Sequence, residues 1–241
     1  MPIQPQPQPE TDNRLGAVVL CGGQSKRMGY DKFRLPFGDK TFLECVVEKL
    51  LGQIDGPIVA SANTETREEV SEIVDGISSD RVSVVIDQKT DCGPIEGIRC
   101  GLQALSKHVP WAFVTSCDVP LIRPGIVSVL QEVLLELSDG SQPCDAVVPQ
   151  HGSRIYGMTA LYRTSIIATI EQMIDQGSLR VSDLSKAVSA RMIDVQDLRS
   201  ADPDLESMMN LNSPGQYFEL IRSAGLECPP NILERLAKPN D

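Results

Sequence analysis

The sequence predicts an α/β fold: a single-domain, three-layer α/β/α sandwich on a mainly parallel, Rossmann-like sheet. First, apolar β-branched runs alternate with segments whose apolar residues recur every three or four positions, and short links join them. Second, the strand-like runs are continuous in apolar residues, so we expect strands buried on both faces. Third, 241 residues with 41% hydrophobic and 23% charged side chains are typical of one globular domain.

The first third of the chain predicts two strand–helix units and a third strand. Residues 15–21 (LGAVVLC) form a β-branched apolar run that indicates a buried strand, and residues 40–54 place their apolar side chains at helical spacing. Residues 56–63 (GPIVASAN) predict the second strand. Residues 65–77 predict a polar helix that ends near a glycine, and residues 81–88 (RVSVVIDQ) predict the third strand.

The middle of the chain continues the alternation. Residues 93–109 carry one apolar stripe at helical spacing, and residues 111–118 (WAFVTSCD) indicate a fourth strand. Residues 123–137 predict a helix with a proline near its start, where a missing N–H does no harm. Residues 144–150 (CDAVVPQ) predict a fifth strand.

The last third is less regular. Residues 156–163 are compatible with a strand, and residues 164–177 predict a helix that opens with a Thr or Ser cap and stops at a glycine. A short helix at 180–188, a strand at 191–196 and a helix at 213–225 follow.

Composition sets the expected boundaries of the folded domain. Residues 1–13 alternate proline with glutamine and acids, so we expect a disordered tail. Residues 14–225 form the predicted domain, and residues 226–241 a C-terminal extension with one or two amphipathic turns.

The charge and the cysteines exclude several classes of function. A formal net charge of −11 disfavours binding to nucleic acid or to anionic lipid. No apolar run reaches the roughly 20 residues of a membrane span, and the N-terminus does not resemble a signal peptide, so we expect a cytoplasmic protein. Seven cysteines without a CxxC pair predict buried thiols rather than disulfides or a zinc site.

In open α/β sheets, ligands bind beyond the carboxyl ends of the strands, so we expect a site where the predicted strands end. The residues that follow the five strands combine glycine, amide, carboxylate and base: Gly22-Gly23, Asn63, Asp87, Asp118, and His151 with Arg154. This composition suits a nucleotide and a metal ion.

The first of these strand ends leads into a glycine turn followed by cations. Gly22 and Gly23 allow a close approach to the backbone, and Lys26, Arg27 and Lys32 follow within nine residues. Neither a Walker A motif nor a GxGxxG fingerprint is present. A simple tight turn is the alternative, but three cations in an acidic chain favour phosphate binding.

Asp118 lies just past the fourth strand, opposite the glycine turn, in "TSCDVPL". A carboxylate in this position suits Mg²⁺, which protein sites hold through one or two carboxylates plus substrate phosphates. The alternative is a loop aspartate that caps the next helix. Asp87 presents the same two possibilities.

Four motifs in order resemble one family: "LCGGQSKRMGYDK", "DCGPIEGI", "TSCDVPLI" and "NLNSPGQY". Over roughly residues 15–220 the chain resembles the molybdenum cofactor guanylyltransferases, the MobA-like branch of the nucleotidyltransferases. The resemblance implies a fold of nucleotide-diphospho-sugar transferase type for residues 14–225. It also implies Mg²⁺-dependent transfer of GMP from GTP to the phosphate of molybdopterin, with release of pyrophosphate.

The resemblance implies roles for residues at the strand ends. The implied nucleotide-binding residues are Leu20, Cys21, Gly22, Gly23, Arg27, Lys32, Asn63, Asp87 and Asp118. Arg27, Lys32 and Asp118 are implied to be catalytic, Asp118 as the Mg²⁺ ligand. Asn210 and Asn212 are implied to lie near the pterin on the acceptor side.

Several alternatives stay open. Cytidylyl-transferring relatives tend to read Ala-Ala-Gly and Asp-Gln-Pro, whereas Cys-Gly-Gly and Asp-Val-Pro here favour guanine. Residues 151–162 lack the His-Pro-Leu usual in the family, so the acceptor could be a sugar phosphate or another small phosphate. A non-catalytic nucleotide-binding subunit and a nicotinamide-dependent oxidoreductase are the other candidates. Molybdoenzyme apoproteins or cofactor-insertion proteins are the implied protein partners.

Overall fold

The computed structural model describes residues 14–22, 28–137 and 143–237. The expected disordered tail at 1–13 and the residues Gly23 and Arg27 lie outside the described residues. No helix in these three ranges is long and apolar enough to cross a membrane.

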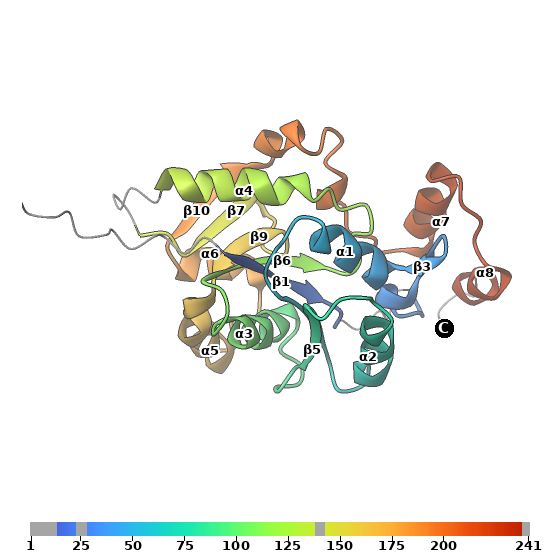
Figure 1. Cartoon of the computed structure of the whole chain (residues 1–241), viewed down its shortest axis with the longest axis horizontal. Coiled ribbons are helices and arrows are strands. Elements are labelled where there is room, and N and C mark those ends of the chain that lie inside the picture. Colours follow the sequence, from blue (N-terminus) through green and yellow to red (C-terminus); the bar gives the residue numbers. More distant parts are fainter. Residues whose placement is uncertain (1–13, 23–27, 138–142, 238–241) are drawn as a thin grey trace, which may run out of the picture.

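One twisted sheet forms the centre of the domain (Figure 1), with strand order β10-β7-β9-β6-β1-β4-β5 and β8 paired to the end of β7. Strand β9 is antiparallel to both β6 and β7, and the other neighbours along this path are parallel. The strands are β1 (Leu15–Leu20), β4 (Ile58–Ala62), β5 (Val82–Ile86), β6 (Trp111–Ser116), β7 (Ala146–His151), β8 (Arg154–Ile155), β9 (Ala160–Arg163) and β10 (Ala190–Asp194).

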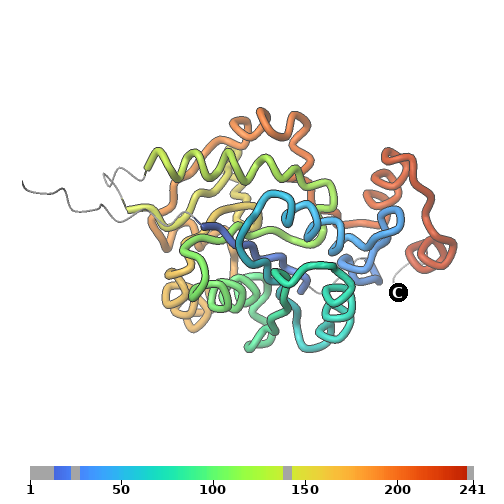
Figure 2. The backbone as a smooth tube through the Cα atoms, viewed as in Figure 1, coloured from blue at the N-terminus to red at the C-terminus, as the bar shows by residue number. Residues whose placement is uncertain are grey.

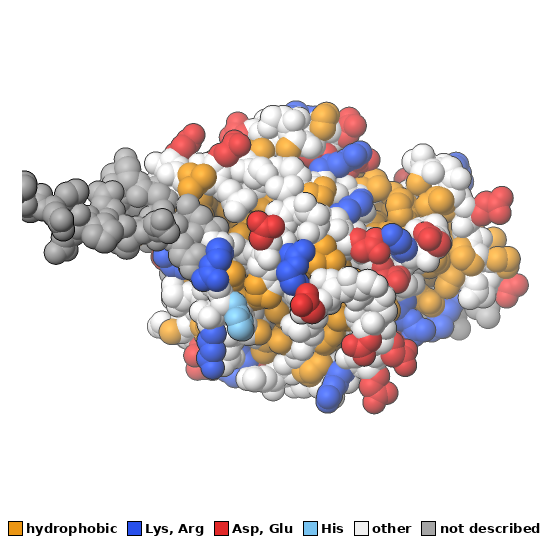
Figure 3. All heavy atoms as spheres, in the orientation of Figure 1, with side chains coloured by type: hydrophobic (Ala, Val, Ile, Leu, Met, Phe, Trp, Pro, Cys, Tyr) orange, Lys and Arg blue, Asp and Glu red, His pale blue; other side chains and the backbone are white. Residues whose placement is uncertain are grey.

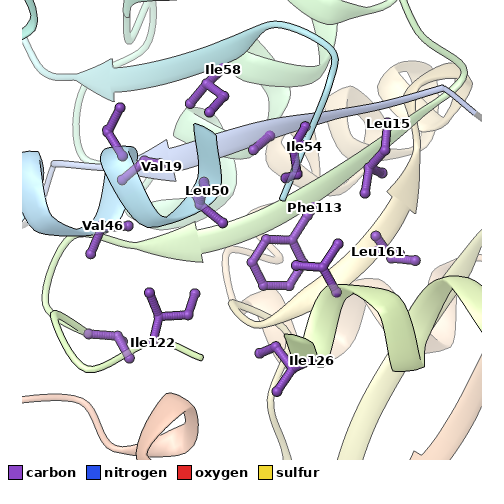
Figure 4. Packing of buried hydrophobic residues seen from close by; sticks show 14 of the residues in the cluster. Leu15, Val19, Val46, Leu50, Ile54, Ile58, Phe113, Ile122, Ile126 and Leu161 are labelled. Atoms are coloured by element: carbon purple, nitrogen blue, oxygen red, sulfur yellow. The ribbon is translucent and has the colours of Figure 1, made fainter. Parts of the chain in front are cut away.

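Helices cover both faces of the sheet. One face packs against α1 (Phe42–Leu51), α2 (Arg67–Asp75) and α4 (Gly125–Glu136) in one hydrophobic cluster. Figure 4 shows Leu50 of α1 and Ile126 of α4 in this cluster with Phe113 of β6. The other face packs against α3 (Pro94–Leu105), α5 (Ile167–Asp175) and α6 (Val181–Ala187). The predicted three-layer sandwich is confirmed.

A third, smaller core joins the C-terminus to the segment that follows β1. Helices α7 (Pro214–Ser223) and α8 (Pro230–Leu236) pack against the hairpin of β2 (Pro36–Phe37) and β3 (Lys40–Thr41). The Tyr217 hydroxyl donates to the Pro36 carbonyl oxygen at 2.9 Å. Figure 2 shows the C-terminal trace beside the early hairpin. Short 3₁₀ turns complete the structure: Lys32–Arg34, Thr164–Ile166, Val195–Ser200 and Glu206–Met208.

Two local expectations are wrong. Strands β5 and β10 lie at the edges of the sheet and are only partly buried, because an edge strand has a neighbour on one side only. The helix predicted at 164–177 begins as a 3₁₀ turn, and the Thr164 hydroxyl donates to the Val109 carbonyl oxygen at 2.9 Å instead of capping it. That hydroxyl ties the turn to the segment between α3 and β6.

Candidate active site

The site is built where the central strands end. Backbone hydrogen bonds extend the pairing one residue past each strand: Cys21 N donates to Ser61 O at 2.8 Å, and Cys117 N donates to Leu20 O at 3.0 Å. Asp87 N donates to Ala62 O at 2.9 Å in the same way. The residues that follow these strands are therefore held side by side at one edge.

A cavity of about 670 Å³ opens at this edge, between the ends of β1, β4 and β5 and the start of α3. Its volume lies in the range of small-molecule sites, about 300–1,000 Å³. Four residues implied to bind the nucleotide line it: Leu20, Gly22, Asn63 and Asp87. Ser61, Lys89, Gly93 and Gly97 also line it.

Asp87 is the half-buried carboxylate of the cavity. The Ser61 hydroxyl donates to Asp87 Oδ1 at 2.8 Å. Burial raises the pKa of Asp87 above its ordinary value, and this hydrogen bond opposes the rise. Gly22 lies against the other oxygen, because a Cβ placed on Gly22 would sit 3.5 Å from Asp87 Oδ2. A ligand with adjacent N–H donors would find an acceptor here.

Asn63 has a structural task besides lining the cavity. Its Oδ1 accepts from the Thr66 backbone N at 2.9 Å and from the Thr66 hydroxyl at 3.0 Å, which orders the turn into α2. The amide nitrogen takes no part in these two bonds.

The start of α3 forms another wall of the cavity. Gly93 adopts φ +65°, which glycine does without strain, and Pro94 follows as the first helical residue. A Cβ on Gly97 would lie 2.9 Å from Ser61 Oγ and 3.0 Å from Leu20 Cδ2. The absent side chain therefore lets α3 sit directly on the strand ends.

A second group of residues gathers around Asp118. Lys32 Nζ lies 2.7 Å from Asp118 Oδ2 and 3.0 Å from Asn212 Oδ1, and Asn210 Nδ2 donates to Asp118 Oδ1 at 3.3 Å. The Asp118 side chain is 7% exposed and that of Lys32 is 19% exposed. Asp118 does not cap α4, because that helix begins at Gly125 without a side-chain cap.

The structure thus brings Asn210 and Asn212 to the residues implied to be catalytic. Leu211 N donates to the Asp118 carbonyl oxygen at 3.3 Å, and Asn212 N donates to Gln216 Oε1 at 2.7 Å. The loop is therefore held between β6 and α7. In the described residues, no group of three or more His, Cys, Asp and Glu side chains could hold a metal ion, so Asp118 offers one carboxylate.

His151 and Arg154 lie at the same sheet edge but away from the cavity. The order β7-β9-β6-β1 separates them from the central strands. His151 Nδ1 lies 3.8 Å from Asp194 Oδ1, and the Arg154 guanidinium lies 4.8 Å from the centre of the Tyr156 ring. Neither His151 nor Arg154 is among the residues that line the cavity.

Cys21 is not among the residues that line the cavity: its side chain is buried beside Cys117, and its backbone N donates to Ser61 O. The neighbouring Cys21 thiol and burial together raise the pKa of Cys117. Sequence reasoning missed Ser61 and Gly97. The Gly-Pro pair followed by a glycine in "DCGPIEGI" was the available signal for a tightly apposed helix start.

Comparison with known proteins gives one family. Residues 17–190 match the model of the MobA-like NTP transferase domain. A "probable molybdenum cofactor guanylyltransferase" of Methanothermobacter thermautotrophicus is 31% identical over 82% of this chain and 94% of its own length. The "molybdenum cofactor guanylyltransferase" of Syntrophotalea carbinolica is 30% identical over 87% and 91%.

Solved structures share the fold. The "molybdopterin-guanine dinucleotide biosynthesis protein A" of Archaeoglobus fulgidus superposes with a TM-score of 0.70 at 23% identity, over 87% of this chain and 98% of that one. A nucleotidyl transferase of Methanothermobacter thermautotrophicus gives 0.66 at 17% identity, over 88% and 97%. The match over residues 17–190, with relatives at 30–31% identity along most of their length, shows that this chain belongs to the family of MobA-like NTP transferase domains.

Proposed function

We propose that the protein transfers GMP from GTP to the phosphate of molybdopterin and releases pyrophosphate. The observation that supports this most is the pairing of a cavity of about 670 Å³, lined by Gly22, Asn63 and Asp87, with the Lys32–Asp118 group at the end of the adjacent strand β6. The names of relatives at 30–31% identity support the choice of guanine and of the molybdenum cofactor.

In this proposal the cavity holds the base and ribose. The backbone of Leu20–Gly22 contacts them, and the Asp87 carboxylate accepts from adjacent donors of a base, such as N1–H and N2–H of guanine. The triphosphate then extends toward Lys32, and we assign Arg27 to the same phosphates. The first-turn N–H groups of α3 add a partial positive charge near the cavity.

The proposed chemistry is one displacement at phosphorus. An oxygen of the acceptor phosphate forms a bond to the α-phosphorus, the bond to the β-phosphate oxygen breaks, and pyrophosphate leaves. Because the acceptor is already an anion, no general base is required. The task of the protein is to align the two phosphates and to neutralise the leaving charge.

Asp118 is the residue that would hold Mg²⁺. A carboxylate has about four lone-pair positions, and Lys32 and Asn210 use two of them, so the remaining positions fit an ion that completes its shell with water and phosphate oxygens. The ion would supply charge neutralisation on the phosphates. Asn210 and Asn212 border this group, and we assign them to the acceptor side on the family resemblance.

The same site could serve another nucleotide or acceptor. A CTP-dependent enzyme, a sugar-phosphate nucleotidyltransferase and a non-catalytic nucleotide-binding subunit are the alternatives that the experiments must separate. The face in Figure 3 intermixes acidic and basic side chains, with no broad basic patch among the described residues drawn there, so nothing on that face favours a nucleic-acid acceptor.

The first experiment compares GTP, CTP, ATP and UTP, each with Mg²⁺, in a thermal unfolding assay. A nucleotide at about 100 times its Kd stabilises by about 2.7 kcal/mol, which raises the Tm of a domain of this size by about 5–10 °C. GTP should give the largest shift. A larger shift with CTP would assign the protein to cytidylyl transfer instead.

The second experiment tests turnover. Asp118→Asn keeps the size of the side chain and one oxygen for Lys32, but it gives up the bond from Asn210 and removes the charge that would hold the cation. Pyrophosphate release from GTP and molybdopterin should fall by at least about a hundredfold, while the far-ultraviolet spectrum and GTP-free Tm stay close to wild type. Full activity in this variant would refute the metal-site assignment, and a wild-type protein that binds GTP without turnover would indicate the non-catalytic subunit.

A further inference from the structure

A buried ion pair lies behind the cavity wall. Glu96 and Arg99, one turn apart on α3, are 0% and 3% exposed. Arg99 Nε donates to Glu96 Oε2 at 2.8 Å, and Arg99 Nη2 donates to Glu96 Oε1 at 2.7 Å. Neither side chain lines the cavity or contacts the Lys32–Asp118 group.

The carboxylate of this pair holds the loop that follows β5. Glu96 Oε1 also accepts from the backbone N atoms of Gln88 and Lys89, each at 3.1 Å. These are the two residues directly after Asp87. The Glu96 carboxylate therefore fixes the path of the chain on the C-terminal side of the cavity's own carboxylate.

The guanidinium fixes the same loop through a side chain. Arg99 Nη2 donates to Gln88 Oε1 at 2.9 Å, while Arg99 Nη1 donates to Gln103 Oε1 at 2.9 Å. Asp87 and Lys89 line the cavity, whereas Gln88 between them is bonded to Arg99 behind the wall. The ion pair therefore determines which side chains of the loop face the cavity and which face away from it.

Stability alone gives a poor account of this pair. Burying two charges costs much of what their attraction returns, and apolar residues of similar volume are often as stable in such positions. Hydrogen bonds from backbone N–H groups to a charged acceptor are stronger than neutral ones, so they restrict a loop more tightly. The specific consequence of the pair is the placement of residues 87–89.

We infer that Glu96 and Arg99 are positioning residues for the nucleotide: they hold the loop 87–89 so that Asp87 faces the base in the cavity. The identity of the nucleotide in this inference rests on the proposed function. The placement of the loop does not depend on it.

The test separates positioning from stability with a double variant, Glu96→Met with Arg99→Met. It removes both charges and leaves apolar side chains in the buried space, so the fold should persist with a Tm within a few degrees of wild type. The Kd and the KM for GTP should rise about tenfold, the equivalent of one lost charge-assisted hydrogen bond, while kcat stays within about twofold because neither residue touches a reacting atom.

Hydrogen exchange at the backbone of Gln88 and Lys89, measured without nucleotide, gives the second readout and should become faster in the double variant. Glu171→Gln is the matched control, since Glu171 is a half-exposed partner 3.5 Å from Arg99 Nη1 and holds no part of the loop. Exchange and affinity in the control should equal wild type.

The outcomes are distinct. Unchanged exchange at 88–89 in the double variant, or faster exchange with unchanged GTP affinity, would overturn the inference. If the double variant does not fold, Glu96→Gln in the full chain replaces it, and wild-type exchange and affinity there would overturn the inference equally. A wild-type protein that binds no GTP would refute the proposed function, and the exchange measurement would still test the loop.

Discussion

Helix α3 contains two glycines, four residues apart. Replacing the first by alanine tests the cavity, and replacing the second by alanine tests the core. Gly97→Ala adds a methyl group 2.9 Å from Ser61 Oγ and 3.0 Å from Leu20 Cδ2. Gly101→Ala adds one 2.5 Å from Val18 Cγ1 and 2.6 Å from Val18 Cγ2. Both overlaps are tight, but the atoms involved differ in their freedom to move.

The overlap at Gly101 cannot be removed by a side-chain rotation. Both γ carbons and the Cβ of Val18 lie within 3.1 Å of the new methyl group, so rotating the valine side chain does not remove the contact. Overpacking of this kind costs about 1–3 kcal/mol, and replacing a helical glycine by alanine returns about 0.5–1 kcal/mol. We expect Gly101→Ala to lower the free energy of unfolding by about 1–2 kcal/mol, or the Tm by about 2–8 °C.

The overlap at Gly97 can be relieved by movement of the Ser61 hydroxyl and the end of the Leu20 side chain. The helix gain then offsets most of the cost, so the Tm should change by about 0–3 °C. The rotated hydroxyl no longer donates to Asp87 Oδ1, from which it now lies 2.8 Å away. Because Asp87 lines the open cavity, water can replace the lost donor in the free protein, which keeps the stability loss small. The carboxylate is then no longer held in place for the ligand, so we expect GTP affinity to fall by roughly tenfold.

Thermal unfolding without nucleotide and calorimetric titration with GTP check both variants. Gly97→Ala should lose affinity with little loss of stability, and Gly101→Ala should lose stability with little loss of affinity per folded molecule. The reasoning would be wrong if the order of the two Tm values were reversed, or if both variants bound GTP as tightly as wild type.

Three further predictions concern substitutions of Lys32, Asp87 and Ile232. Lys32→Met removes the cation paired with Asp118, and pyrophosphate release should fall by about a hundredfold; wild-type release would contradict its phosphate role. Burial raises the folded-state pKa of Asp87 above 3.8, so its ionisation lowers stability as the pH rises through that pKa. Asp87→Asn should therefore unfold at a higher Tm than wild type at pH 7, and the excess should vanish as the pH falls toward 3.8. Ile232→Ala, in the core of α7 and α8, should cost about 2–5 kcal/mol in chemical denaturation; a cost near zero would show that α8 does not contribute.

The parts of the fold that the sequence predicted are those encoded locally. Helical spacing and continuous apolar runs identified α1, α3 and the central strands, since both patterns require only neighbouring residues. The rule that ligands bind at carboxyl ends predicts that Asn63 and Asp87 share one edge of the sheet, and both line the cavity there.

The parts that the sequence did not predict depend on strand order and direction. The four-residue run of β9 does not encode that it enters antiparallel between β6 and β7, and this insertion moves His151 away from the cavity. Ser61 looked like an ordinary strand residue because its partner, Asp87, belongs to the neighbouring strand's end. Glu96 lies one residue off the apolar stripe of α3, and nothing local indicates which loop it holds.

The two halves of the site rest on different parts of the molecule. The cavity is formed by strand ends and α3, whose packing belongs to the main sheet. The Lys32–Asp118 group instead receives Asn210 and Asn212 from a loop whose Leu211 packs against the small core of α7 and α8. Substitutions in that small core should therefore lower turnover more than they lower affinity for the base. Substitutions around α3 should lower affinity for the base more than they lower turnover, which is why the two quantities can be measured separately in this protein.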